Sequence, residues 1–309
     1  MHETVKKELI EQIIRLRPTL SPKKRRVADF MMEDYKRLFL MSAKEIARRC
    51  EVSEPTITRF VTDLGFSGYA DFEQYLKGLL RIELTSVERL LKADRQDEQT
   101  STLAAYYQNT LLNLENMMKS VSELELKALA RLIFDAESVL IAGYKASATL
   151  ALYLGYLLKK IKAGILIDTN YAWDNLDHIA LHGPATLLVV IAFPRYPQRA
   201  LELVQYAKQH DSRVFCLTDN LKSPLVNLAD QYLVIDMEGI SFVDPFSHII
   251  TFLGALVLEI AYIDKDATAR RLSKIEDGAR SRSDFFTENK DEMKKDDPTR
   301  IEYYENNSL

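Results

Sequence analysis

Two groups of polar residues near the amino terminus have side chains that suit contacts with a nucleic acid. One is a basic cluster that could pair with phosphate oxygens, namely Lys23, Lys24, Arg25 and Arg26. The other is a short polar segment that could reach base edges in the major groove of DNA, namely Ser53, Glu54, Pro55, Thr56, Thr58 and Arg59. Residues 1–80 carry 15 basic and 12 acidic side chains, whereas the remaining residues have a net charge of −7. We therefore expect a DNA-facing module attached to an acidic body.

A third group of residues follows apolar runs in the second half of the chain, where a ligand site could form. Its members are Gly143, Tyr144, Lys145, Ser147, Phe193, Arg195, Tyr196, Thr218 and Ser223. Backbone N–H groups beside Ser147 and the guanidinium of Arg195 suit an anion such as a phosphate. Three positions have alternatives: Arg195 could pair with a nearby acid or lie at a subunit interface, Tyr196 could pack on Arg195, and Ser223 could cap a helix. We expect a small anionic ligand here.

The polar segment at 53–59 belongs to a pattern typical of a helix-turn-helix. Residues 41–66 predict two short helices joined by a tight turn, with Ser42 and Ser53 as amino-terminal caps. The residues expected to face inward are Ile46, Ala47, Cys50, Ile57, Phe60, Val61 and Leu64. A preceding helix at 21–35 would carry the basic cluster in its first turn. The alternatives are a helical hairpin used only for packing and a first turn that is merely solvated.

The second half of the chain has a different pattern, in which short apolar runs alternate with helical stretches. The runs are 138–143, 164–169, 185–193, 213–219 and 231–237. Strands that are apolar on both faces indicate a parallel sheet covered on two sides. The predicted fold class is therefore α + α/β, an all-α helix-turn-helix domain followed by a doubly wound five-stranded parallel sheet. Amphipathic helices at 103–134 lead into the sheet, and a last helix is expected at about 247–264.

A polar stretch between the two patterns marks the expected domain boundary. The predicted limits are 1–84 for the DNA-binding domain, 85–102 for a linker, 103–280 for an effector-binding and oligomerisation domain, and 281–309 for a charged tail. The helices at 103–134 could also supply a dimer surface.

Several other classes of protein are disfavoured. Cys50 and Cys216 are far apart, with no CxxC and no histidine at ligand spacing, so we expect neither a metal nor a disulfide framework. The sequence GYKASA lacks the glycine pattern of a dinucleotide site, and no cofactor is expected. Glu238 and His248 are the one acid–base pair that an isomerase could use, and we interpret them as a loop residue and a helix-face residue. The charged amino terminus and the short apolar runs favour a cytoplasmic protein with no membrane span.

Three segments within residues 18–77 match a known pattern: LSPKKRRVADFMMEDY, SEPTITRF and LGFSGYADF. Together they resemble the N-terminal domain of the RpiR family of bacterial transcriptional regulators. Glu51 departs from that pattern, because such turns usually carry glycine. A non-glycine residue there must accept a left-handed conformation or alter the turn, at a cost of about 1 kcal/mol.

Residues 125–265 resemble the sugar isomerase (SIS) domain, although the usual phosphate loop S-x-S-G-x-T is replaced by residues that include FPRY, with Arg195 as the candidate substitute. The resemblance implies a transcriptional regulator, and not an enzyme, that senses a phosphorylated sugar or a related anionic carbohydrate. It also implies a homodimer or homotetramer on a palindromic double-stranded DNA operator. The alternative is a sugar-phosphate isomerase with an accessory helical domain.

Overall fold

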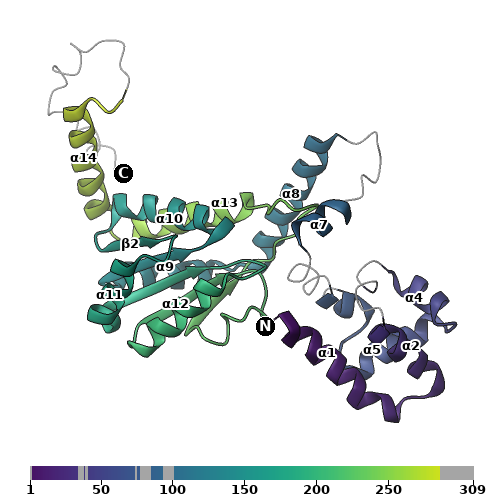
Figure 1. Ribbon diagram of the computed structural model, residues 1–309. Helices are drawn as coiled ribbons and strands as arrows, with labels where there is room; N and C mark the ends of the chain where they lie inside the picture. The colour runs from purple at the N-terminus through teal and green to yellow at the C-terminus, as the bar shows by residue number, and fades with distance from the viewer. Residues whose placement is uncertain are drawn as a thin grey trace.

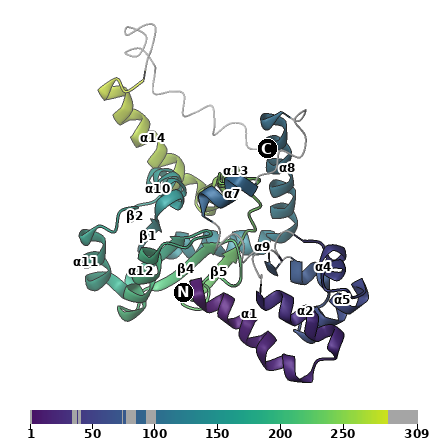
Figure 2. The same ribbon diagram turned by 45° about the vertical axis from the view of Figure 1, so that its right-hand side comes forward.

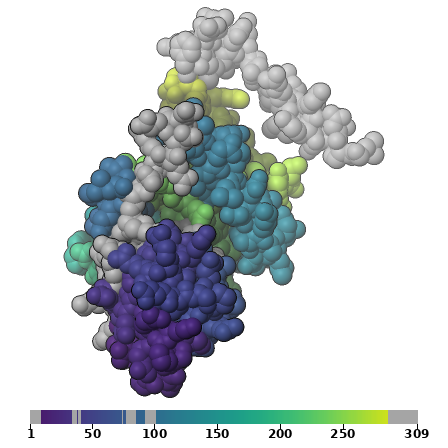
Figure 3. Space-filling model, turned by 90° about the vertical axis from the view of Figure 1, so that its right-hand side faces the viewer, coloured from purple at the N-terminus to yellow at the C-terminus, as the bar shows by residue number. Residues whose placement is uncertain are grey.

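The computed structural model describes residues 2–33, 38, 41–73, 75–76, 85–92 and 101–285. Its amino-terminal part contains α1 (His2–Leu16), a 3-10 helix (Arg17–Thr19), α2 (Pro22–Glu33), α4 (Ala43–Arg49) and α5 (Glu54–Asp63). These helices surround a separate apolar core that includes Met31, Ile57 and Phe60. In the space-filling view they form the purple and dark blue lobe at the bottom (Figure 3). The predicted helix-turn-helix is confirmed.

Local hydrogen bonds explain where α4 and α5 begin. The Ser42 hydroxyl accepts the Glu45 N–H, and the Glu45 carboxylate accepts the Ser42 N–H at 2.7 Å, which forms a capping box. Ser53 occupies the N-cap position of α5, but its side chain caps no backbone group and instead lies 2.9 Å from the Thr56 hydroxyl. The expected Ser53 side-chain cap is therefore wrong, because the Thr56 hydroxyl takes the place of the backbone N–H. Pro55 is tolerated in the first turn, where no N–H is needed.

The turn between α4 and α5 adopts the left-handed conformation expected at Glu51, with φ of 50°. Arg26 of α2 supports this turn, since Nη2 donates to the Glu51 carbonyl at 3.1 Å and Nη1 to its carboxylate at 3.2 Å. A charge-assisted hydrogen bond of this kind offsets part of the cost of a non-glycine residue in the turn.

The carboxyl-terminal part is built on one all-parallel sheet. Its strands are β1 (Ser138–Gly143), β2 (Ile165–Asp168), β3 (Thr186–Ile191), β4 (Arg213–Thr218) and β5 (Gln231–Val234), in the order β2-β1-β3-β4-β5. Every residue of β1 and β3 is buried, as expected for strands covered on both faces. All five predicted strands are confirmed. The strand order reverses beside β1, and ligands of such sheets bind beyond the carboxyl ends near that point.

Helices cover both faces of the sheet (Figure 1). One face packs against α9 (Glu123–Asp135), α10 (Ala148–Ile161) and α13 (Ser247–Ile263), and the other against α11 (Trp173–His182) and α12 (Gln198–Gln209). Close packing of α10 depends on Gly155, because a Cβ there would lie 2.4 Å from Ile167 Cδ1. Two more helices, α8 (Thr102–Ser120) and α14 (Lys265–Arg282), flank this body, and α14 extends away from the sheet (Figures 1 and 2).

Two connections differ from a simple alternation of strands and helices. The segment 219–230 forms turns, so the helix expected to start at Ser223 and Pro224 is wrong. Short-range bonds such as Ser223 N–H to the Asn220 carbonyl and burial of Leu225 hold these turns between two neighbouring strands. Part of the predicted linker is a short helix, α7 (Ser86–Lys92), whereas residues 93–100 and the predicted tail from 286 lie outside the described residues.

Within the described ranges, no single helix is long and apolar enough to cross a membrane. Only α13 and α14 taken together reach that length and composition, and they meet at an angle of 109°.

Candidate functional site

The outer face of α5 carries the residues predicted to contact bases. Ile57, Phe60 and Val61 are fully buried, so the remaining positions of the helix face outward. The predicted residues that are exposed are Ser53, Glu54, Pro55, Thr58 and Arg59, and Thr56 is half-buried. One hollow on this face is lined by Glu54, Pro55, Thr58 and Arg59. Four of the six residues thus line one hollow, and their hydroxyl, carboxylate and guanidinium groups suit base edges.

Most of the predicted phosphate contacts are engaged within the protein. Lys24 forms an ion pair with Asp63 at the end of α5, and Arg26 holds the turn between α4 and α5. Arg25 donates to a backbone carbonyl of the same domain at 3.3 Å. Lys23 is exposed, and no hydrogen bond or ion pair of its side chain is found among the described residues. The basic cluster therefore fastens α2 to α5, and Lys23 is its most available cation.

The second group of predicted residues lies at the carboxyl edge of the sheet. Gly143 ends β1 and pairs with Ile191, which in turn pairs with Leu217 of β4. The loops after β1, β3 and β4 therefore start side by side. The first of them is so tight that a Cβ on Gly143 would lie 2.5 Å from the Ser147 carbonyl oxygen. Glycine is needed there for space.

Backbone strain is concentrated in these loops. Lys145, Tyr171 and Arg195 have φ of 56°, 61° and 70°, and they follow β1, β2 and β3 respectively. Each is a non-glycine residue in the left-handed region, which costs roughly 1 kcal/mol or more and is frequent at ligand sites. One such residue in each of three neighbouring loops supports a binding role for this edge.

Two buried tyrosine–carboxylate pairs line the same edge. The Tyr144 hydroxyl donates to Asp168 at 3.1 Å, and the Tyr196 hydroxyl donates to Asp219 at 2.8 Å. Burial, followed by the adjacent carboxylate, raises the pKa of both phenols well above the usual value. Both tyrosines therefore act as neutral hydrogen-bond donors. Asp168 also accepts backbone N–H groups of the loop after β2, which fixes that loop.

Three hydroxyl groups at this edge are buried, on Ser147, Thr218 and Ser223. The Ser147 side chain forms no cap at the start of α10. The Ser223 Oγ is shielded from solvent and lies beside the Tyr196 hydroxyl. These hydroxyl groups therefore lie beneath the surface of the edge.

The charged members of the group point to solvent. Arg195 and Lys145 are exposed, and Arg195 Nη1 donates to the Ser86 hydroxyl of α7 at 3.1 Å. Phe193 is buried on the other side of the loop, with its ring 5.7 Å from that of Phe246. The structure thus leaves the Arg195 guanidinium exposed, in contact with α7.

The two residues considered as an acid–base pair for an isomerase both take part in contacts with backbone groups. His248 is buried on α13, and its Nε2 lies 3.0 Å from the backbone carbonyl of Asp236. The backbone of Glu238 is held by both amide atoms of Asn113, a buried residue of α8, at 2.8 Å each. These contacts fix the loop after β5 onto α8.

Burial lowers the pKa of His248. The folded state therefore binds its proton less well than the unfolded state, so its contribution to stability is present above the unfolded pKa of about 6.5 and is lost as the pH falls below it. We expect thermal unfolding of the carboxyl-terminal domain to become pH-dependent below about pH 6.5, with a smaller slope in His248→Gln. An unchanged slope in this variant would assign the dependence to other groups.

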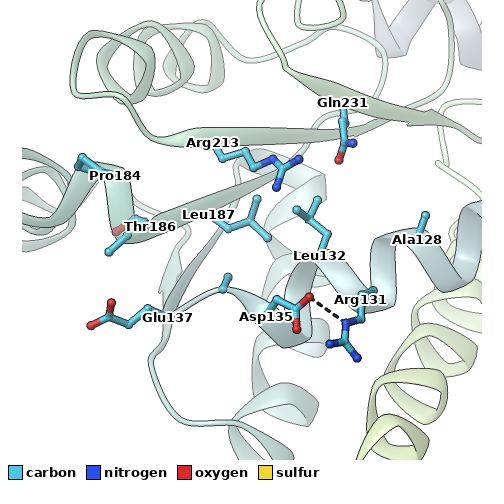
Figure 4. Close-up of a pocket in the computed structure, with 12 residues that line it drawn as sticks. Ala128, Arg131, Leu132, Asp135, Glu137, Pro184, Thr186, Leu187, Arg213 and Gln231 are labelled. Carbon is cyan, nitrogen blue, oxygen red and sulfur yellow. Dashed lines mark hydrogen bonds and ion pairs between the residues drawn. The ribbon is translucent and has the colours of Figure 1, made fainter.

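A separate groove of about 500 Å³ lies at the opposite, amino-terminal edge of the sheet (Figure 4). Its lining includes Arg131, Asp135, Arg213 and Gln231, and the first two form an ion pair at 2.8 Å. None of the nine predicted effector residues lines it. Across the described part of the chain, no group of three or more His, Cys, Asp or Glu residues is arranged to hold a metal ion.

Asp168 and Ser86 are among the components of the carboxyl edge that were not predicted from the sequence, as are Tyr171 and Asp219. Asp168 is the last residue of β2, an otherwise apolar strand. An acidic residue at the carboxyl end of such a strand is the feature of the sequence that could have indicated a site residue. Ser86 lies in the polar linker, where nothing in its neighbourhood indicates a contact with Arg195.

Comparison with known proteins follows the same division of the chain. Residues 7–82 match the model of the helix-turn-helix domain of the rpiR family, and residues 132–259 match that of the SIS domain. The chain is 24% identical over 230 residues to an HTH-type transcriptional regulator of Haemophilus influenzae, covering 73% of this chain and 79% of that protein. It is 23% identical over 212 residues to the HTH-type transcriptional regulator HexR of Pseudomonas aeruginosa, covering 69% of this chain and 73% of that protein.

Solved structures share the fold. The NanR protein of Vibrio vulnificus, complexed with ManNAc-6P, is 20% identical with a TM-score of 0.54, covering 87% of this chain and 98% of that one. The sugar isomerase domain of an RpiR transcription factor from Sphaerobacter thermophilus is 21% identical with a TM-score of 0.54. The match covers 57% of this chain and 99% of that one. Both domains, in this order, are thus matched, and the chain belongs to the rpiR family of helix-turn-helix transcriptional regulators that carry a SIS domain.

Proposed function

We propose that this regulator binds double-stranded DNA through the outer face of α5. The observation that carries the proposal is the division of that helix into a fully buried apolar face and an exposed face of Ser53, Thr58, Arg59 and their neighbours. A helix presented in this way fits the major groove, while exposed Lys23 on α2 is suited to a phosphate. DNA binding of this kind agrees with a site of action in the cytoplasm.

Two single variants test this assignment. Arg59→Ala is expected to weaken operator binding by about 1–3 kcal/mol and to relax the preference for one base, because a base contact is lost. Lys23→Ala is the matched control on α2 and is expected to weaken operator and random DNA alike. Both are measured by fluorescence anisotropy with operator and scrambled duplexes. Equal losses on both duplexes for Arg59→Ala would contradict a role in base recognition.

We further propose that the carboxyl edge of the sheet binds a phosphorylated sugar or a related anionic carbohydrate. Support comes from the three buried hydroxyl groups, from the left-handed residues in the neighbouring loops, and from the exposed Arg195 at the same edge. Hydroxyl and phenol groups suit the oxygen atoms of a sugar, and a guanidinium suits its anionic group. The NanR protein, which shares this fold, is complexed with ManNAc-6P.

We propose a homodimer or homotetramer on a palindromic operator. Large apolar side chains are exposed on helices that flank the sheet, among them Leu103, Met118, Tyr156, Leu258 and Tyr262. Exposed apolar residues on several neighbouring helices are typical of a contact surface between subunits. Symmetric association of two copies would present two α5 helices to one duplex.

The domain division predicts that residues 101–285 fold without the amino-terminal domain. Each half has its own buried apolar core, so removal of one leaves the other intact. We expect this fragment to unfold cooperatively, to associate in sedimentation equilibrium, and to bind the effector. A molten or strictly monomeric fragment would contradict this division.

The alternative function, a sugar-phosphate isomerase, predicts aldose–ketose turnover. We expect no turnover above background, because His248 is buried and its Nε2 lies within hydrogen-bond distance of the Asp236 carbonyl. Turnover of a hexose phosphate by the purified chain would favour the isomerase.

A further inference from the structure

Helix α7 is fastened to the SIS domain by one arginine. The Arg89 side chain is largely sheltered; its Nη1 lies 3.1 Å from the Asp244 carboxylate, and Nη2 donates to the Phe242 carbonyl at 2.5 Å. Both partners belong to the segment between β5 and α13, beside which α7 lies (Figures 1 and 2). Charge-assisted hydrogen bonds of this geometry are strong, so Arg89 anchors α7.

The first residue of α7 makes a weaker contact with the candidate effector site. The Ser86 hydroxyl accepts a hydrogen bond from Arg195 Nη1 at 3.1 Å. The Arg195 side chain is exposed, so burial does not fix its guanidinium in place. A phosphate is a stronger, charged acceptor for a guanidinium than a neutral hydroxyl is. An anion at Arg195 would therefore compete with Ser86 for the same donor.

A third contact joins the two parts of the chain at the same edge of the sheet. The Lys222 ammonium, in the turns after β4, lies 3.0 Å from the centroid of the Tyr75 ring, which packs against the core of the amino-terminal domain. The loops after β3, β4 and β5 thus each contact a residue that precedes the SIS domain. The edge that would hold the effector is also an edge to which the DNA-binding half is attached.

We propose that α7 is a strap that reports occupancy of the effector site to the DNA-binding domain. When an anion takes the Arg195 guanidinium, Ser86 is released while Arg89 keeps its partners, and α7 pivots about that anchor. Helix α7 then moves relative to the amino-terminal domain, which precedes it in the sequence. This inference rests on the proposed effector site for its trigger, but the docking of α7 by Arg195 is independent of any ligand.

Hydrogen exchange of the full-length protein tests the docking directly. We expect Arg195→Ala to raise the exchange rate of α7 amides several-fold with no ligand added, because the Ser86 contact is lost. Arg199→Ala is the matched control: Arg199 is also exposed, on the following helix, and pairs with Glu202. It should leave α7 exchange unchanged. Unchanged α7 exchange in Arg195→Ala would show that the strap does not exist, whatever the protein binds.

The trigger is tested with ManNAc-6P and inorganic phosphate as probes. Each is expected to raise α7 exchange in the parent, and Ser86→Asp should weaken probe binding about ten-fold, because its carboxylate competes for Arg195. Ser86→Ala should bind at least as tightly as the parent. If neither probe bound the parent but Arg195→Ala still raised the exchange of α7, the proposed class of effector would be wrong. The docking of α7 by Arg195 would stand. Binding of a probe without any change at α7 would overturn the coupling.

Discussion

Replacing Phe60 by alanine is expected to unfold the amino-terminal domain and to abolish DNA binding. The Phe60 side chain is fully buried between α5 and the rest of its core, and truncation of such a residue costs about 3–5 kcal/mol. A core of this size supplies only about 3–5 kcal/mol in total, so the variant loses most or all of the stability of its domain. We expect reduced helix content by circular dichroism at room temperature and no binding to the operator.

The SIS domain should be unaffected by this change, because its core clusters share no residue with that of the amino-terminal domain. Its thermal transition therefore serves as an internal reference within the same sample. Thr58→Ala, on the exposed face of the same helix, is the matched control and should alter stability by less than about 0.5 kcal/mol. A Phe60→Ala protein with parental helix content and operator affinity would contradict the assigned packing of α5.

Replacing Arg195 by alanine is expected to weaken effector binding by roughly 1.5–3 kcal/mol, which is about 10- to 150-fold. The change removes an exposed guanidinium that the loop after β3 carries at the carboxyl edge of the sheet. Unliganded stability should be nearly unchanged, since the side chain is exposed and its hydrogen bond to Ser86 is a surface contact. The effector should therefore raise the thermal midpoint of the parent and produce little shift in the variant.

Thermal shift and calorimetry with a confirmed ligand measure both quantities. Arg131→Ala is the control, because Arg131 is exposed and lines the groove at the opposite edge of the sheet. If Arg195→Ala bound the ligand as tightly as the parent, or unfolded the ligand-free domain, Arg195 would be structural. The anion contact would then have to be sought among Ser147, Thr218 and Ser223.

Periodic patterns account for the elements that the sequence predicts well. Alternation of apolar runs with helical stretches predicts five parallel strands, and the buried positions of α5 follow from helical spacing. Both signals are local, and many residues contribute to each of them. Burial of Ile57 and Phe60 confirms the predicted inner face of the recognition helix.

Contacts between distant residues account for what the sequence does not predict. Lys24 pairs with Asp63, 39 residues away, and Arg195 bonds Ser86 at a separation of 109 residues. Neither partner can be chosen from composition or spacing. The expected helix at Ser223 fails for a similar reason, because the connection between neighbouring strands is filled by turns around buried Leu225, and this packing overrides the local capping signal.

The internal pairing of the basic cluster changes how much positive charge reaches DNA. Its four cations suggest release of up to four counterions from the duplex for each subunit, since every neutralised phosphate liberates about 0.9 of an ion. Lys24 and Arg26 already face the carboxylates of Asp63 and Glu51, so they bring little net charge to the phosphates. The cluster should therefore release a number of counterions from the DNA that is closer to two for each subunit than to four. Binding by this regulator should consequently tolerate added salt better than a count of its lysines and arginines indicates.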